Sequence, residues 1–335
     1  MRGGLSSPFF IERNRMIYLK ITAVTFVGIA ILVLAISWFL FQFACRRNDK
    51  INENTALSNL EKGELSAYAP IIREGLEAFQ TANKEDLWIQ SRDGLSLHGY
   101  FLKTKNARGT ILLTHGWRGR VGYDFSGAWR DYRAMGYNLL AIEQRTHGAS
   151  EGQYICFGVK ERYDLIDWIR FLNTKIGDDL PVILSGISMG SSTVMMAIGS
   201  EELPHNVVGA VADCGFTSAW DEFSYVLKTR FHLPVFPFLY VADAMSKVFA
   251  GFSFRECSTT ETLQNAKVPV LFVHGEADTF VPILNTRENN TACASRHEVI
   301  TVKNASHGMS YLVDHDRVKQ KVTEFLNSLS ERKLS

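Results

Sequence analysis

The sequence lacks several features that mark particular classes of protein. Its five cysteines are scattered and include no C-x-x-C pair, so their spacing favours neither a zinc site nor a disulfide framework. Basic and acidic residues nearly balance, 36 against 35, which removes the electrostatic reason to expect a nucleic-acid partner. Internal repeats and low-complexity tracts are also missing from the 335 residues. We therefore expect one large globular unit that acts on small molecules, plus an accessory segment.

A long charge-free run near the start of the chain is the first positive feature. No charged residue occurs in residues 21–45, and about 20 apolar residues suffice for a transmembrane helix. A cleaved signal peptide is the alternative, but its apolar stretch is normally about 7–15 residues long and ends in small residues, whereas residues 39–43 are bulky. A buried core helix of this length would seldom be apolar on every face. The run therefore predicts a transmembrane helix over residues 21–45 and a single-pass membrane protein.

The regions on either side of this helix complete the expected domain organisation. Arginines and lysines flank the run on both sides, so the positive-inside rule selects neither side of the membrane for the rest of the chain. Residues 1–20 form an N-terminal tail, residues 46–80 form a polar juxtamembrane connector, and residues 81–335 form the main domain. We expect residues 1 to about 45 to anchor the protein without taking part in its chemistry. The sequence indicates no oligomeric state.

In the main domain, short β-rich runs alternate with helical patterns, which is typical of a mostly parallel sheet covered on both faces. Arg92-Asp93-Gly94 predicts the turn of an opening hairpin. Apolar residues at three- and four-residue steps predict a helix within residues 159–172, and residues 314 to about 329 predict another. The expected strands are residues 87–90, 95–102, 110–114, 137–142, 181–185, 207–212, 268–273 and 298–302.

Ligands of open α/β sheets bind beyond the carboxyl ends of the strands, so the residues after each expected strand are the candidate functional residues. Gly186 and Gly190 flank Ser188 at the appropriate distance for a sharp strand-to-helix turn, where neighbouring side chains must be absent. The helix that follows would favour negative charge developing near the serine. Serine is a weak nucleophile until an imidazole takes its proton, and that imidazole needs a carboxylate to orient it. Asp278 and His307, each following a later strand, would supply these groups.

These motifs, in the chain order Ser188, Asp278, His307, resemble the α/β-hydrolase superfamily over about residues 85–330. Asp278 lies in an H-G-x-x-D pattern after a strand, as in that family. The resemblance implies an α/β-hydrolase fold in which Ser188 is the nucleophile, His307 moves the proton and Asp278 orients His307. It also implies an oxyanion hole formed by the backbone N–H groups of Trp117 and Met189. No metal, nucleotide or other cofactor is implied.

Several other polar residues near the strand ends have competing interpretations. Asp213 follows another strand and is the alternative to Asp278 as the acid of the triad. Residues 143–150 resemble the family's D-x-R-G-H-G-x-S loop, with glutamate in place of aspartate and threonine in place of glycine. We expect this loop to hold neighbouring loops near the pocket rather than to act in catalysis. Arg118 and Arg120 are either solvated loop residues or contacts for an anionic substrate group.

The segment between Asp213 and residue 268 is too long for a plain connection and is rich in aromatic residues. By its resemblance to the family, this segment forms a small cap over the active site, at about residues 216–262. We expect its rings to line an apolar slot that suits small to medium acyl chains.

The predicted function is that of a serine hydrolase that cleaves carboxylic esters of such chains through an acyl-enzyme intermediate. The pattern most resembles bacterial membrane-anchored hydrolases of the esterase and lipase type, which implies a bacterial cell membrane as the location. A thioesterase or a peptidase with the same triad is an alternative, because fold and triad do not fix the leaving group. A membrane-tethered binding protein on an inactive hydrolase scaffold is another alternative, although such proteins usually lack a triad or turn residue and none is missing here.

Overall fold

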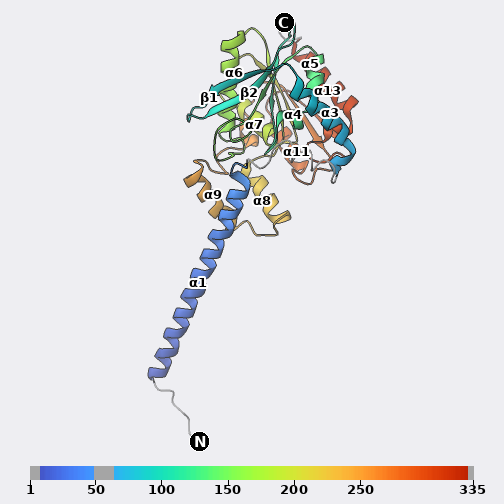
Figure 1. Ribbon diagram of the computed structural model, residues 1–335. Coiled ribbons are helices and arrows are strands. Elements are labelled where there is room, and N and C mark those ends of the chain that lie inside the picture. The colour runs from blue at the N-terminus through green and yellow to red at the C-terminus, as the bar shows by residue number, and fades with distance from the viewer. Residues whose placement is uncertain (1–7, 49–63, 331–335) are drawn as a thin grey trace.

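The N-terminal helix α1 (Pro8–Cys45) extends away from a rounded body that contains the rest of the described chain (Figure 1). The computed structural model describes residues 8–48 and 64–330. Residues 1–7 of the expected tail and residues 49–63 of the expected connector therefore lie outside the described part. Within α1, Arg15–Cys45 is long and apolar enough to cross a membrane. The helix begins before the charge-free run and ends with it.

One eight-stranded sheet forms the centre of the body. Its strands are β1 (Glu85–Gln90), β2 (Ser96–Leu102), β3 (Thr110–Thr114), β4 (Asn138–Ile142), β5 (Val182–Ile187), β6 (Val207–Asp213), β7 (Val270–Gly275) and β8 (His297–Val302). They lie in the order β1-β2-β4-β3-β5-β6-β7-β8. The pairs β1–β2 and β2–β4 are antiparallel, and all remaining pairs are parallel. This sheet confirms the predicted α/β fold.

Helices cover both faces of the sheet, so the strands carry apolar side chains on both sides (Figure 1). One face packs against α6 (Glu161–Ile176), α7 (Met189–Ile198), α10 (Thr259–Leu263) and α11 (Leu284–Ala292). The other face packs against α3 (Ala69–Thr81), α5 (Trp129–Ala134) and α13 (His315–Ser330). Shorter elements are η1 (Glu64–Tyr68), α4 (Val121–Asp124) and α12 (Ser310–Val313).

The expected cap is built around two helices, α8 (Ala219–Thr229) and α9 (Phe238–Phe249), in the connection from β6 to β7. Both lie beside the end of α1, where that helix reaches the body (Figure 1). Phe41 and Cys45 of α1 belong to one buried apolar cluster together with Leu239 and Phe254 from the cap segment. The end of α1 and the cap therefore share a hydrophobic core that is separate from the two cores against the sheet.

Candidate active site

Ser188 lies at the sharp turn between β5 and α7 and holds a backbone conformation that is rare for residues other than glycine. Its φ is 56° and its ψ is −121°, and such a conformation typically costs about 1–3 kcal/mol. A Cβ on Gly186 would collide with the backbone of Gly190, and a Cβ on Gly190 would collide with the carbonyl oxygen of Thr114. The two glycines therefore make the turn possible, as the G-x-S-x-G pattern predicts.

Three polar side chains at this edge of the sheet form a hydrogen-bonded chain. Nε2 of His307 lies 2.8 Å from Oγ of Ser188, and Nδ1 of His307 lies 2.7 Å from Oδ2 of Asp278. With its proton on Nδ1, the ring donates to Asp278 and accepts from the Ser188 hydroxyl, which is the tautomer that a general base requires. The three residues follow or end β5, β7 and β8, so segments far apart in the sequence meet at one point.

The carboxylate of Asp278 is buried and held by several donors. Its Oδ1 accepts hydrogen bonds from the N–H groups of Phe280 and Val281 at 2.8 and 2.9 Å, and its Oδ2 lies 3.3 Å from Nε2 of His274. Burial acts to raise the pKa of Asp278, but the contacts with His274 and His307 outweigh it and hold that pKa well below its usual range. His274 opens the same H-G-x-x-D pattern, but the pattern alone does not predict its contact with Asp278.

Asp213, the alternative acid, occupies a different position. It ends β6, and its backbone carbonyl accepts a hydrogen bond of 2.8 Å from the N–H of Ser188. Its carboxyl is buried, and Oδ1 has no hydrogen-bond partner among the described residues. Burial raises the pKa of Asp213 to about 7, so the group is partly protonated near neutral pH. The geometry favours Asp278 over Asp213 as the partner of His307.

The loop after β3 brings the expected oxyanion-binding groups close to the nucleophile. A Cβ on Gly116 would lie 3.3 Å from Cβ of Ser188, so the loop backbone passes directly beside the serine. The N–H groups of Trp117 and Met189 donate no hydrogen bond to the part of the chain that the structure describes. Both groups are therefore available to bind negative charge that develops on a substrate oxygen.

The loop after β4 connects neighbouring segments, as its resemblance implied. Oε2 of Glu143 lies 2.8 Å from Nδ1 of His98 and accepts a hydrogen bond of 2.6 Å from the N–H of Ala149. His115 accepts a hydrogen bond of 3.1 Å from the N–H of Gln144. Burial lowers the pKa of His115 to about 4, so its ring is neutral at pH 7. These contacts fix the framework around the site.

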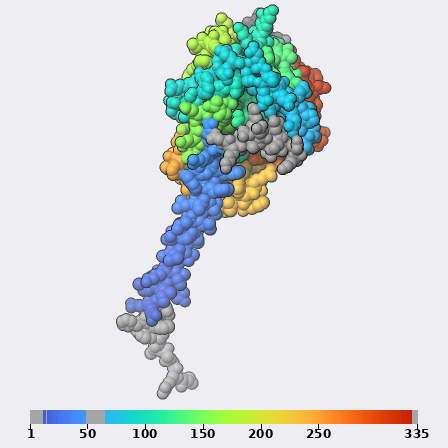
Figure 2. All heavy atoms as spheres, viewed as in Figure 1, coloured from blue at the N-terminus to red at the C-terminus, as the bar shows by residue number. Residues whose placement is uncertain are grey.

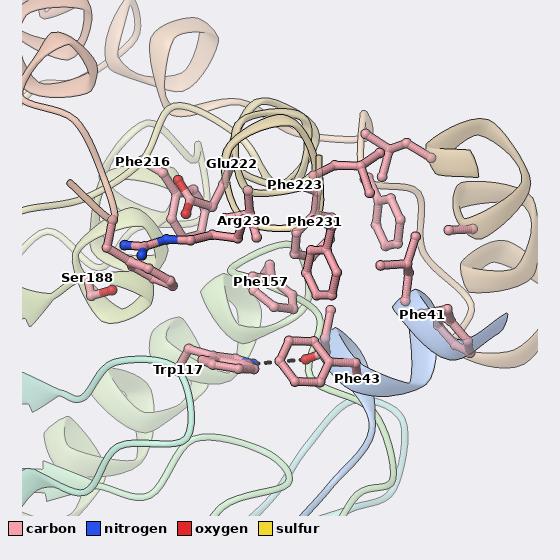
Figure 3. Close-up of a pocket in the computed structure, with 18 residues that line it drawn as sticks. Phe41, Phe43, Trp117, Phe157, Ser188, Phe216, Glu222, Phe223, Arg230 and Phe231 are labelled. Atoms are coloured by element: carbon pink, nitrogen blue, oxygen red, sulfur yellow. Dashed lines mark hydrogen bonds between the residues drawn. The ribbon is translucent and has the colours of Figure 1, made fainter. Parts of the chain in front are cut away.

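An apolar cavity of about 300 Å³ opens beside Ser188 (Figure 3). Ser188, Arg230 and one acid interrupt its apolar wall. The acid is Glu222 of α8, which lines the cavity while only 5% exposed. Its Oε1 has no hydrogen-bond partner among the described residues. Burial raises the pKa of Glu222 to about 8, which leaves most of this carboxyl protonated at pH 7. The aromatic residues of the wall are Phe41, Phe43, Trp117, Phe157, Phe216, Phe223, Phe231, Phe254 and Phe280.

The end of α1, in the expected anchor segment, forms part of this wall. Leu40, Phe41, Phe43 and Ala44 all line the cavity. The indole N–H of Trp117 donates a hydrogen bond of 2.8 Å to the carbonyl oxygen of Ala44, drawn as a dashed line in Figure 3. A charge-free run has the same composition whether lipid or protein covers its last turns, so composition alone does not predict this contact.

Neither loop arginine faces the cavity as a free cation. The guanidinium of Arg118 donates a hydrogen bond of 2.7 Å to the carbonyl oxygen of Phe43 and lies 4.5 Å from the centre of the Trp117 ring. It thereby satisfies a carbonyl group at the C-terminal end of α1, where a cation is electrostatically favoured. Arg120 lies 4.0 Å from a carboxylate oxygen of Glu143.

One group of side chains in the described part of the chain brings together three potential metal ligands. Sγ of Cys214, a carboxylate oxygen of Asp278 and a ring nitrogen of His307 lie within 4.8 Å of one another. The imidazole and the carboxylate already bond to each other, and burial raises the pKa of Cys214 well above its usual range, which disfavours the thiolate. The arrangement suits proton transfer better than metal binding.

Comparison with known proteins identifies the family of this chain. Residues 111–321 match the alpha/beta hydrolase family. The chain belongs to this family. A relative named YqkD from Bacillus subtilis is 27% identical over 260 residues, which cover 76% of this chain and 83% of that protein. An esterase of Pyrococcus furiosus has a similar fold, with a TM-score of 0.62, 21% identity and coverage of 76% of this chain and 93% of that one. Est1E from Butyrivibrio proteoclasticus gives a TM-score of 0.57 at 16% identity, over 73% of this chain and 99% of that one.

Proposed function

We propose that this α/β-hydrolase is a serine hydrolase that cleaves carboxylic esters, with Ser188 as its nucleophile. The observation that carries the proposal is the hydrogen-bonded chain from Ser188 through His307 to Asp278, with links of 2.8 and 2.7 Å. The strained backbone at Ser188 supports it, because such strain is concentrated at functional sites. The Pyrococcus furiosus protein that shares this fold is named as an esterase, which agrees with this chemistry.

In the proposed reaction, Oγ of Ser188 attacks the ester carbonyl carbon while its proton moves to Nε2 of His307. The carbonyl oxygen becomes an oxyanion that the N–H groups of Trp117 and Met189 stabilise, and one such donor typically contributes about 10²–10³ in rate. His307 passes the proton to the departing alcohol, and the acyl group stays on Ser188. His307 then deprotonates a water molecule that attacks the acyl-enzyme, and it returns this proton to Oγ of Ser188 as the acid is released. Asp278 remains ionised and stabilises the imidazolium in both halves.

The substrates we propose are esters of small to medium acyl chains. A cavity of about 300 Å³ lies at the lower end of the usual range for ligand pockets, and its wall is apolar apart from Ser188, Glu222 and Arg230. Such a wall gains free energy from each methylene that it removes from water, about 0.8 kcal/mol at most. Activity should therefore rise with acyl length until the chain fills the cavity.

We propose in addition that α1 is a single-pass anchor in a bacterial cell membrane. The length and apolar composition of Arg15–Cys45 support this location, as does a relative from Bacillus subtilis. A cleaved signal peptide fits less well, because cleavage after the apolar run would remove Leu40, Phe41, Phe43 and Ala44 from the cavity wall.

The proposal is tested by labelling the full chain with a fluorophosphonate and by measuring kcat/KM for p-nitrophenyl esters from acetate to palmitate. We expect labelling of the parent but not of Ser188→Ala, and a maximum at an intermediate acyl length. Absence of labelling in the parent would contradict the serine mechanism and favour the inactive-scaffold alternative. Labelling without ester hydrolysis, together with cleavage of thioesters or peptides, would show that the protein is a thioesterase or a peptidase instead.

A further inference from the structure

The last turns of α1 are held by the body through both main-chain and side-chain contacts. The N–H of Ile155 donates a hydrogen bond of 2.6 Å to the carbonyl oxygen of Cys45, and the N–H of Arg47 donates one of 2.9 Å to Gln153. Phe41 is buried, and its ring stacks on that of the tyrosine between Gln153 and Ile155. These contacts join the end of α1 to residues 153–155 of the body. The end of α1 is therefore a structural part of the body.

Phe43 connects the two sides of the cavity. Its ring centre lies 6.0 Å from that of Trp117, whose backbone N–H is a proposed oxyanion donor, and 5.8 Å from that of Phe231 in the cap. Figure 3 shows these rings around the cavity, with Ser188 on its far side. Phe43 thus spans the gap between the oxyanion loop and the cap. The side chain of Phe26, nearer the start of the same helix, is 73% exposed and does not line the cavity.

The apolar wall continues outward onto the exposed surface around α1. On the cap, Phe236, Tyr240, Val248 and Phe249 are exposed apolar or aromatic side chains, and the Phe249 ring lies 5.0 Å from that of Trp38 in α1. Figure 2 shows cap atoms on both sides of the helix where it leaves the body. Exposed apolar surface of this extent marks an interaction site. A lipid bilayer is the occupant that fits best, because the same helix continues outward as an apolar segment long enough to span it.

We propose that the cap face rests on the bilayer and that the acyl chain of the substrate enters the cavity from the lipid, along the last turns of α1. The substrate class is then an ester that partitions into a membrane, and Phe43 is a residue that determines which acyl chains fit. This inference rests on the proposed ester hydrolysis at Ser188 and adds where the substrate comes from. The helix that anchors the protein thereby also shapes its pocket.

The first test compares Phe43→Ala with Phe26→Ala in the full chain, in detergent. Truncation at Phe43 opens the wall between Trp117 and Phe231, so kcat/KM for octanoate should fall about five-fold and the optimum should move to longer acyl chains. Phe26→Ala removes a ring of the same size from the outer surface of the same helix and should keep the parent profile. Equal profiles for the two variants, whether changed or unchanged, would overturn the role of Phe43.

The second test places Val248→Asp and Val299→Asp in phosphatidylcholine vesicles. Val248 is 76% exposed on the cap face beside α1, whereas Val299 is 41% exposed on β8 of the body. A carboxylate on a membrane-contacting surface is costly, so Val248→Asp should lower the octanoate-to-acetate ratio of rates about three-fold in vesicles. Val299→Asp should leave that ratio at the parent value. If Val248→Asp leaves the ratio unchanged, or if it lowers the ratio equally in detergent, the bilayer is not the occupant of the cap face.

Fluorophosphonate labelling separates this inference from the proposed function. All four variants should be labelled at Ser188, because none of them alters the hydrogen-bonded chain. A parent protein that is labelled and hydrolyses esters, with variant pairs that do not differ, would overturn the lipid-entry inference alone. A parent that is neither labelled nor active would overturn both.

Discussion

The two sides of the active site are built by different means. On the side of the sheet, Ser188, His307 and Asp278 are fixed by hydrogen bonds between 2.7 and 2.9 Å, some of them from backbone N–H groups. On the side of the cap and α1, packed aromatic rings surround a cavity that contains one buried carboxyl, Glu222. Hydrogen bonds are directional, whereas apolar contacts depend on area. Changes on the first side should alter the chemical step, and changes on the second should alter which ester is used.

The sharpest test of the polar side is Ser188→Ala. Loss of the nucleophile should reduce kcat for p-nitrophenyl butyrate by at least about three powers of ten. Ser191→Ala is the matched control, because Ser191 is a buried serine in the helix that follows Ser188, and its hydroxyl has no partner among the described residues. Its kcat should stay near that of the parent. Hydrolysis by Ser188→Ala at the parent rate would show that Ser188 is not the nucleophile.

The next largest effect is expected from the acid that orients His307. Asp278→Asn replaces an acceptor by an amide that favours the wrong histidine tautomer, so kcat should fall by about 10³–10⁴. Asp213→Asn should reduce kcat far less, because Asp213 makes no hydrogen bond to His307 in this structure. Steady-state kinetics of both variants test this ranking, with thermal unfolding as the control for folding. A larger fall in kcat for Asp213→Asn than for Asp278→Asn would identify Asp213 as the acid of the triad.

An intermediate effect is expected where the two sides meet. Trp117→Phe removes the indole N–H that donates to Ala44 but keeps an aromatic ring beside Phe43, and kcat should fall about three- to ten-fold. Trp129→Phe removes an equivalent bond, of 3.0 Å to the carbonyl oxygen of Gly75, in a part of the body away from the cavity. That variant should lose stability without a matching loss in kcat. A similar fall in kcat for both tryptophan variants would show that α1 does not position the oxyanion loop.

The smallest effect concerns the buried carboxyl on the apolar side, and it should appear in stability. The pKa of Glu222 is raised from 4.5 to about 8, so the unfolded chain ionises at lower pH than the folded one. The parent should therefore lose stability as the pH rises from about 4.5 to about 8, with no further loss above that window.

Glu222→Gln carries no ionisable group at this position, so its Tm should rise relative to the parent across the same window. The expected gain is about 2–4 °C for each kcal/mol recovered. Glu288→Gln, at an exposed position on α11, is the control and should track the parent at every pH. A constant difference between Glu222→Gln and the parent would mean that Glu222 is not a buried acid.

Much of the polar side could be predicted from the sequence. Buried parallel strands are continuous apolar runs, so residues 110–114 are recognised directly and coincide with β3 (Thr110–Thr114). The residues that follow such strands, including Ser188, Asp278 and His307, then meet at one edge of the sheet. Because each of these residues follows a predicted strand, the sequence is enough to predict that they lie together.

The contacts on the apolar side could not be predicted in the same way. The bond between Trp117 and Ala44 joins residues 73 positions apart and uses a main-chain acceptor, which leaves no mark on the side-chain pattern. Glu222 has the same sequence signature as a solvated acid on an amphipathic helix, because its burial depends on how α8 packs over the cavity. Tertiary contacts of this kind become visible only when the segments are placed in space.

The direct passage of α1 into the body has a mechanical consequence. Arg46 pairs with Tyr154 immediately after the helix ends, and the guanidinium of Arg47 donates hydrogen bonds to the carbonyl oxygens of Gly148 and Ser150, so the described residues that follow the helix are bonded directly to the body. In a membrane, a helix longer than the hydrocarbon layer adapts by tilting. A helix joined this stiffly would tilt the whole body with it. Bilayer thickness would then set the angle at which the mouth of the cavity meets the lipid headgroups.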